Sequence, residues 1–314
     1  MLRYVLRRVG QALIVLLGVS FIVFALMQLV PGDPVRIALG TRFDQETYDA
    51  LRARAGLDQP VLVQYLSYLT SAITGDLGVS FRTGQPVTVM LLSRLPATLS
   101  LAAMSLLIAL LIALPLGLIA ATRSGKLSDY LATVVSQVGV SIPDFWLAIL
   151  LILVFTSWLG WLPPSGYVPF SESPSGWLEH IILPALTVGV VSGSILTRFV
   201  RSATLESMGQ DYVRTAESKG LPGIVVLRRH VVRGALVPIV TVTGVQLATL
   251  LGGVVVVEVI FAWPGIGRLT LEAVNARDYP LLQGAVLMFA AIFLLVNLLV
   301  DLLYAALDPR IAYA

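Results

Sequence analysis

Carboxylates stand inside three of the long apolar runs of this sequence, at Asp144, Glu258 and Asp301, where an ionised group is costly if the runs cross a membrane. Asp144 follows Pro143 near the middle of the run 130–158, and Glu258 lies within about one helical turn of Trp263. A charge at the centre of a bilayer costs at least about 2.5 kcal/mol on insertion scales, so such a group usually faces a cavity or a partner. Asp144 could therefore line a path and attract an amino group, or it could pair with a neighbouring helix.

Catalytic chemistry has little support. The two histidines, His180 and His230, are expected at the edge of a span and in a polar loop, and the sequence has no cysteine and no G-x-S-x-G nucleophile turn. The sequence also has no G-x-x-x-x-G-K-[ST] phosphate loop, so any ATP must be bound by a partner. The chain is therefore predicted not to be an enzyme. We predict no metal site and no nucleic-acid binding.

The elements that would position these groups are long apolar helices. Of the 314 residues, 57% are hydrophobic and 12% are charged, with a mean hydropathy of +0.89, which is incompatible with a soluble domain. Each span needs about 20 apolar residues. The predicted fold is an all-α membrane protein with six transmembrane helices. The six uncharged or nearly uncharged runs are 9–30, 96–122, 130–158, 181–197, 235–262 and 281–307.

Polar segments divide these runs into three predicted regions. Residues 1–30 form the N-terminus and first span, 31–95 a small extracytoplasmic subdomain, and 96–314 the core with the other five spans. The core contains a basic loop, 205–234. The termini and the loops after the second and fourth spans hold most of the Arg and Lys outside 31–95, whereas the short loops on the other face hold only Arg268 and Arg277, which predicts that both termini are cytoplasmic. Region 31–95 carries six Arg, but it is long enough for the charge rule to be weak there.

The basic loop contains one short predicted helix, Asp211 to Lys219. Gly220 follows in the position of a helix C-cap and Pro222 prevents continuation. A helix this short is unstable alone, so its order must come from packing. Its small residues would give a thin surface that a groove in another protein could accept. The same composition also fits a solvated basic loop without a partner.

The segment resembles the cytoplasmic EAA loop of ABC importer permeases, in the dipeptide, oligopeptide and nickel group. That group has an R-T-A-x-x-K-G-L core, then R-H, then a Pro that opens the next span; here Arg229, His230 and Pro238 hold the last places. Glu217 departs from the basic residue usual in relatives. The residues that the resemblance assigns to ATPase coupling are Arg214, Thr215, Ala216, Glu217, Ser218, Lys219, Gly220 and Leu221.

Motifs along nearly the whole chain are similar to the same family, and their order and spacing carry more weight than any one of them. They are LRYVLRR, PGDPV, GLDQPVLVQYLSYL, GDLGVSF, RLPATLSLA, SIPDFW, GVVVVEVIFAWPGIG, ARDYPLLQG and LVDLLYAALDPR. The match is to the first-permease, or B-type, subunit of the peptide/nickel-type systems. It implies the type I ABC importer permease fold.

The resemblance also implies partners. A second homologous permease would complete a heterodimer in the bacterial cell membrane, and two ATP-binding subunits would hold ATP and Mg. An extracytoplasmic substrate-binding protein would deliver the peptide. The loop segment 211–222 would couple ATP hydrolysis to alternating access. No cofactor is expected in this chain, and membrane lipid surrounds it.

Further residues are candidates for the path and its gate. Gln246 joins Asp144 and Glu258 as a polar group within the spans, while Trp263, Pro264 and Gly265 combine an aromatic anchor with helix breakers and form either an outer gate or a plain tight turn. Alternatives within the family are permeases for nickel chelates or other small solutes. An ion-coupled secondary transporter is the alternative from another class, but no convincing internal repeat supports it. An intramembrane hydrolase is weaker still.

Overall fold

The protein is described by a computed structural model covering residues 2–39, 44–54 and 56–307, in which helices dominate and no strand is formed. Five helices in these ranges are long and apolar enough to cross a membrane, and a sixth span results if one bent pair counts as a single crossing. The prediction of an all-α protein with about six spans is confirmed. The long helices are α1 (Leu2–Leu29), α5 (Val87–Thr122), α8 (Pro174–Met208), α11 (Val232–Gly253) and α14 (Tyr279–Leu307).

The third predicted span is broken rather than continuous. Helix α6 (Leu127–Ser141) is followed by α7 (Asp144–Leu151) and the π-helix η2 (Ile152–Trp158), with a bend of 99° between the two halves. Pro143 has no N–H and forces the residue before it out of the helical region, and Ile142 is extended with φ −82° and ψ 123°. Pro143 thus ends one helix instead of only kinking it.

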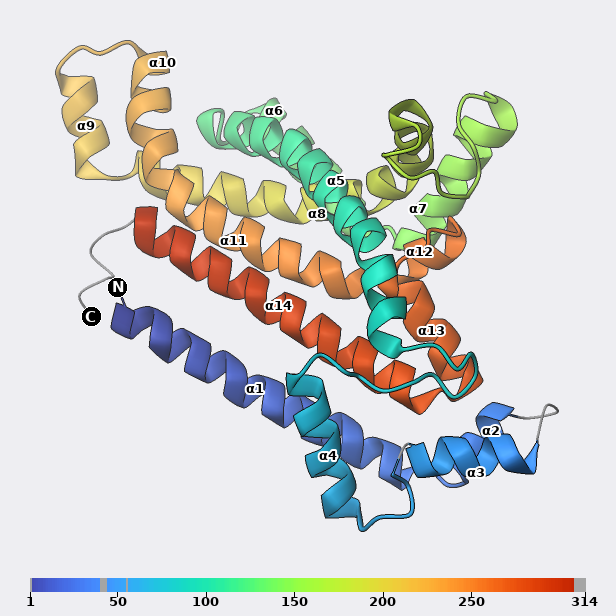
Figure 1. Ribbon diagram of the computed structural model, residues 1–314. Helices are drawn as coiled ribbons and strands as arrows, with labels where there is room; N and C mark the ends of the chain where they lie inside the picture. The colour runs from blue at the N-terminus through green and yellow to red at the C-terminus, as the bar shows by residue number, and fades with distance from the viewer. Residues whose placement is uncertain (1, 40–43, 55, 308–314) are drawn as a thin grey trace. The chain divides into compact units, whose positions relative to one another are not determined.

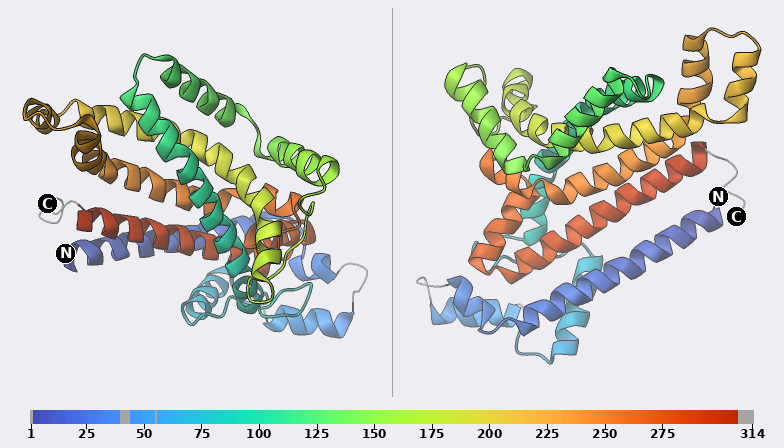
Figure 2. Two further views of the ribbon diagram at one scale, coloured as in Figure 1. Left: turned by 90° about the horizontal axis from the view of Figure 1, so that it is seen from above. Right: turned by 180° about the vertical axis from the view of Figure 1, so that it is seen from behind.

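One compact unit comprises residues 100–263 and 296–307 of the described chain, with α8 at its centre. Figure 2 shows α6 and α11 running beside α8 in both views. Small residues allow this close packing: a Cβ added at Gly193 would lie 3.1 Å from the carbonyl oxygen of Ala109, and Ser136 donates a 2.6 Å hydrogen bond to the carbonyl of Ser194. Helix α8 is therefore the most enclosed span.

The other unit comprises residues 2–99 and 264–295. It contains the short helices α2 (Pro34–Leu39), α3 (Gln45–Arg54), α4 (Val61–Ile73) and α13 (Ile266–Ala276). The start of α5 joins this unit because Val87 and Leu91 are fully buried against residues of α13 and α14. Each compact unit thus combines segments distant in sequence, since residues of α13 and α14 complete the core around the start of α5.

The region after the first span is less uniformly polar than expected. Helix α4 is an apolar helix of 13 residues, too short to cross a bilayer. Its Tyr65 packs edge-on against Phe21 of α1, with ring centroids 5.6 Å apart, and shares a 3.1 Å hydrogen bond with Ser20. Leu62 and Ile73 are 70% and 78% exposed. Helix α4 therefore attaches to the first span and presents an apolar side outward.

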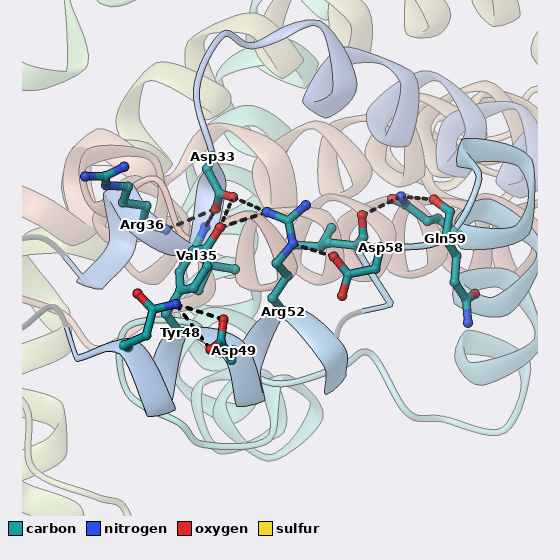
Figure 3. Close-up of polar contacts among 11 residues, drawn as sticks. Asp33, Val35, Arg36, Tyr48, Asp49, Arg52, Asp58 and Gln59 are labelled. Atoms are coloured by element: carbon teal, nitrogen blue, oxygen red, sulfur yellow. Dashed lines mark hydrogen bonds and ion pairs between the residues drawn. The ribbon is translucent and has the colours of Figure 1, made fainter.

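Arg52 is the centre of a polar network that ties this region together (Figure 3). Its guanidinium lies 2.6 Å from Asp33 and 2.5 Å from Asp58, while the Tyr48 hydroxyl donates a 2.7 Å hydrogen bond to Asp33. Burial alone would raise the pKa of Asp33, but the bonds from Tyr48 and from two backbone N–H groups, together with Arg52, hold that pKa below its usual value. The network fixes the turn after α1.

Candidate functional site

The loop between α8 and α11 forms two short antiparallel pieces beyond the end of α8, as Figure 1 shows. Helix α8 ends at Met208, α9 occupies Asp211–Ser218, and α10 (Gly223–Val226) continues through the π-helix η3 (Leu227–Val231) into α11. The predicted short helix is present and ends one residue earlier than expected. Because α10, η3 and α11 follow without a break, the second piece is an extension of the fifth span.

Helix α9 is held by one apolar side. Val213 and Ala216 are 2% and 4% exposed and pack against Val226 and Val231 of the returning piece. The opposite side of α9 carries charged and polar residues that face solvent. An isolated eight-residue helix would be marginal in water, so this small cluster supplies the order that the sequence alone could not.

The end of α9 has the geometry that its sequence predicts. Gly220 has φ +73°, and its N–H donates a 2.9 Å bond to the carbonyl of Glu217, while Lys219 donates a 3.2 Å bond to that of Thr215. Glycine adopts this left-handed conformation without penalty, which closes the helix sharply. Pro222 then starts the return segment with an extended backbone.

A buried hydrogen-bond chain fixes α9 to its neighbours. Ser207 at the end of α8 donates a 2.8 Å bond to the carbonyl of Val231, and its hydroxyl lies 2.9 Å from the hydroxyl of Tyr212 on α9. A Cβ at Gly234 would collide with that Tyr212 hydroxyl, so Gly234 is required for this approach. Three elements, α8, α9 and η3, therefore meet at one buried serine.

An ion pair between Asp129 and Arg201 clamps α6 to α8 in the same unit. Both guanidinium bonds are short, Nε to Oδ1 at 2.7 Å and the terminal nitrogen to Oδ2 at 2.9 Å, and the N–H of Gly125 adds a third at 2.9 Å. The Asp129 side chain is only 7% exposed and that of Arg201 is 33% exposed. Sequence reasoning missed this pair because Arg201 reads as one more loop cation, and its partner lies 72 residues away.

The eight predicted coupling residues are contiguous but do not share one face. Seven of them are exposed, including Arg214 at 73% and Leu221 at 38%, whereas Ala216 points into the cluster that holds α9. Ala216 was expected to contribute to a thin outward surface, and it instead lets α9 approach its own chain. The contact surface available to a partner is formed by the residues flanking it.

Asp144 begins α7 directly after the break at Pro143. It is partly buried, and its Oδ1 atom has no hydrogen-bond partner among the described residues. The alternative that Asp144 pairs with a neighbouring helix would therefore need a partner outside the described residues. A carboxylate oxygen that is buried and unpaired is costly unless it serves a ligand or another chain.

Gln246 and Glu258 are placed differently from Asp144. The Gln246 amide donates a 3.1 Å hydrogen bond to Ser192 of α8, so it joins two spans of this chain. Glu258 is fully buried on α12 (Val255–Ile260), which packs against α7 and α8. Asp144, Gln246 and Glu258 thus lie in the same compact unit.

Trp263 is a buried core residue and not an exposed interfacial anchor. It has no exposed surface, its backbone N–H donates a 2.8 Å bond to the carbonyl of Glu258, and its ring packs edge-on against Tyr167 at a centroid distance of 4.7 Å. Pro264 and Gly265 begin the second unit, where Gly265 precedes α13. The breakers therefore mark the boundary between the two units.

Five or six apolar helices long enough to cross a membrane define a multi-pass membrane protein, and its loop helix α9 is exposed on one side and held on the other. Residues 113–313 match the binding-protein-dependent transport system inner membrane component family, and residues 1–102 match the N-terminal domain of such membrane components. The chain belongs to this family. It is the permease subunit of an ABC importer, not itself catalytic, and it works with ATPase and membrane components of the transporter.

Relatives cover the chain from end to end. It is 44% identical over 309 residues to a putative peptide transport system permease protein of Brucella abortus, covering 98% of both chains. It is 39% identical to the dipeptide transport system permease protein DppB of Alkalihalophilus pseudofirmus over the full length of both, and 41% identical to the glutathione transport system permease protein GsiC of Salmonella typhimurium, again over the full length of both.

The solved structures that the chain resembles have lower sequence identity than these relatives, and they show the fold alone. A structure of the inward-facing MetNI methionine ABC transporter aligns with a TM-score of 0.56 at 18% identity, covering 70% of this chain and 96% of that one. A second structure of the same transporter gives 0.54 at 19% identity. The type I importer fold expected from the sequence is confirmed.

Proposed function

We propose that this chain forms half of the membrane pathway of an ATP-driven importer that carries dipeptides or oligopeptides into the cytoplasm by alternating access. The observation that carries the substrate class is the full-length similarity to permeases named for peptide, dipeptide and glutathione transport. All three names describe short peptides. Nickel chelates or another small solute remain the alternative within the family.

We assign the coupling contact to the exposed part of the segment 211–222. Helix α9 is solvent-exposed on one side and fixed on the other by a buried cluster and the Ser207 network. A rigid protrusion transmits motion better than a mobile loop, because displacement of its tip moves the helices to which it is tied. ATP and Mg would be bound by two partner ATPases, one of which would be seated on this surface.

Asp144, Gln246 and Glu258 are the proposed polar residues of the substrate pathway, with Trp263, Pro264 and Gly265 at its gate. Asp144 is the strongest candidate, since its unpaired Oδ1 could accept a hydrogen bond from the amino group of a peptide. The buried Trp263 and Glu258 would hold the gate segment in place.

The remaining assembly is proposed from the family. A second homologous permease would complete the pathway as a heterodimer, and an extracytoplasmic binding protein would deliver the peptide. Both termini would be cytoplasmic in a bacterial inner membrane, in agreement with the distribution of arginine and lysine.

The test is purification of the tagged chain in mild detergent, identification of the copurifying chains, and uptake assays in proteoliposomes. We expect two ATPases and a second permease, and uptake of a labelled dipeptide that stops when ATP is removed. Uptake that persists without ATP while a proton gradient is intact would instead identify a secondary transporter. Transport of nickel chelates but not of peptides would overturn the substrate class alone.

A further inference from the structure

A basic hollow opens where the loop returns to the fifth span. Its volume is about 890 Å³, and it is lined by Tyr212, Arg228, Arg229, His230, Val232, Arg233, Gly234 and Leu236. The three arginines lie within six residues of sequence, and none of them forms an ion pair with a carboxylate of the described residues. The hollow therefore concentrates positive charge that the described part of the chain does not neutralise.

The wall of this hollow is fixed. Tyr212 is held by its hydrogen bond to Ser207, which in turn binds the carbonyl of Val231, and Gly234 provides the space that the Tyr212 hydroxyl occupies. Arg228 and Arg229 lie on the π-helix η3, and Arg233 lies in the first turn of α11. π-Helical turns are uncommon and are often found at functional sites.

The position of Arg233 along α11 places the hollow near the membrane surface. Residues 234–257 carry no charged side chain. Helix α11, with 22 residues, is about 33 Å long at 1.5 Å per residue, close to the thickness of about 30 Å of the hydrocarbon core. Arg233 is in its first turn, and that turn therefore falls at the level of the lipid headgroups.

The lining also contains an apolar part. Leu236 is 40% exposed and Val232 is partly buried, both next to the arginines. A guanidinium binds phosphate oxygens through paired N–H donors, and a neighbouring apolar surface suits an acyl chain. We propose that this hollow binds the phosphate group of an anionic phospholipid. An acidic surface of a partner protein would complement the arginines but not the exposed Leu236 on the helix that enters the membrane.

The site gives α9 a second attachment. Tyr212 belongs to α9, whereas the arginines belong to η3 and α11, so a lipid seated here contacts both the protruding helix and the span that follows it. Bound anionic lipid would stiffen the connection between them. This inference concerns lipid binding by the chain and does not depend on the identity of the transported solute.

The experiment compares lipid retention by the full chain, with whatever partners copurify. Native mass spectrometry is performed after addition of phosphatidylglycerol or of phosphatidylcholine with the same acyl chains. Each arginine near an anionic lipid surface contributes about fivefold in binding, so Arg229→Gln with Arg233→Gln should weaken phosphatidylglycerol retention about 25-fold. The matched control is Arg123→Gln with Arg198→Gln, two exposed arginines outside the hollow.

Selective retention of phosphatidylglycerol that falls in the first double variant but not in the control supports the proposal, provided that both variants elute as monodisperse protein. Equal retention of the two lipids, or an equal loss in the control, overturns it. Competition with inorganic phosphate distinguishes a lipid headgroup from free phosphate as the ligand. Displacement of phosphatidylglycerol only by a large excess of phosphate supports a lipid site, whereas displacement by phosphate at a concentration equal to that of the lipid identifies a site for free phosphate and overturns the proposal. Loss of ATPase copurification without any change in lipid retention identifies a protein contact and also overturns the proposal.

Discussion

Replacing Arg201 by alanine would leave the Asp129 carboxylate nearly buried with one of its three strong hydrogen bonds. Breaking a fully buried ion pair costs about 3–5 kcal/mol, because the remaining charge is not solvated. Since the Arg201 side chain is 33% exposed, water can partly replace it, and we expect about 2–3 kcal/mol. The N–H of Gly125 continues to bind the carboxylate and limits the loss.

A matched control is available on the same helix. Arg198 is exposed, and Arg198→Ala should change the free energy of unfolding by no more than about 0.5 kcal/mol. The assay is thermal unfolding of the purified protein in one detergent, with Arg201→Ala, Asp129→Ala and the double variant compared in a double-mutant cycle. The pair should show a coupling energy of about 1.5–3 kcal/mol. Arg201→Lys should recover only part of it, because lysine cannot make the two parallel bonds.

Two results would refute the reasoning about this clamp. The first is an Arg201→Ala protein that unfolds at the same temperature as Arg198→Ala. The second is strict additivity of the Asp129 and Arg201 changes, which would mean that the observed bonds contribute no mutual stabilisation. A functional readout accompanies the stability measurement: ATP-driven uptake should decline in Arg201→Ala more than in Arg198→Ala, since α8 leads directly to α9.

Three further outcomes are expected. Gly220→Val should destabilise the loop locally by about 1–2 kcal/mol because of the left-handed backbone, and not through a clash, since a Cβ there meets no atom within 4 Å. ATP hydrolysis should continue while uptake falls, and Gly220→Asn should have a milder effect. Unchanged uptake in the valine variant would contradict the coupling assignment. Asp144→Asn should reduce peptide uptake while the complex assembles normally, and equal uptake would leave Asp144 with a structural role. Because the pKa of Asp33 is lowered in the folded protein, its stabilising contribution is complete above the ordinary carboxyl pKa and is lost as the pH falls through the lower folded value. Hydrogen exchange of residues 44–54 should become faster over this pH range, and Asp33→Asn should abolish this pH dependence.

The spans and the loop helix were predictable because their signals are local. Apolar runs with at most one charged residue define the crossings, and Gly220 with Pro222 marks the end of α9 whatever surrounds it. The sequence likewise shows a proline, Pro143, within the third run. It could not give a bend of 99°, because the direction of α7 depends on its packing against α8 and α12.

The features that sequence reasoning missed depend on residues far apart. Trp263 looked like an interfacial anchor because tryptophan is common at membrane surfaces, but Tyr167 from a distant loop covers its ring. Ala216 looked available to a partner because it is small and lies in a polar loop, whereas Val226 and Val231 bury it. Burial of this kind is a property of tertiary packing, and one sequence without the fold does not contain it.

The contacts of the first unit form a continuous connection from the exposed helix to the pathway candidate. Helix α9 is tied to α8 through Ser207 and Tyr212, α8 is clamped to α6 by Arg201 and Asp129, and α6 ends at the break that precedes α7. Each of the first two joints is a buried or nearly buried polar contact, which resists sliding. Because α7 itself packs against α8, a displacement applied to α9 should be carried through α8 both to α6 and to α7, where Asp144 with its unpaired Oδ1 begins the helix after the break.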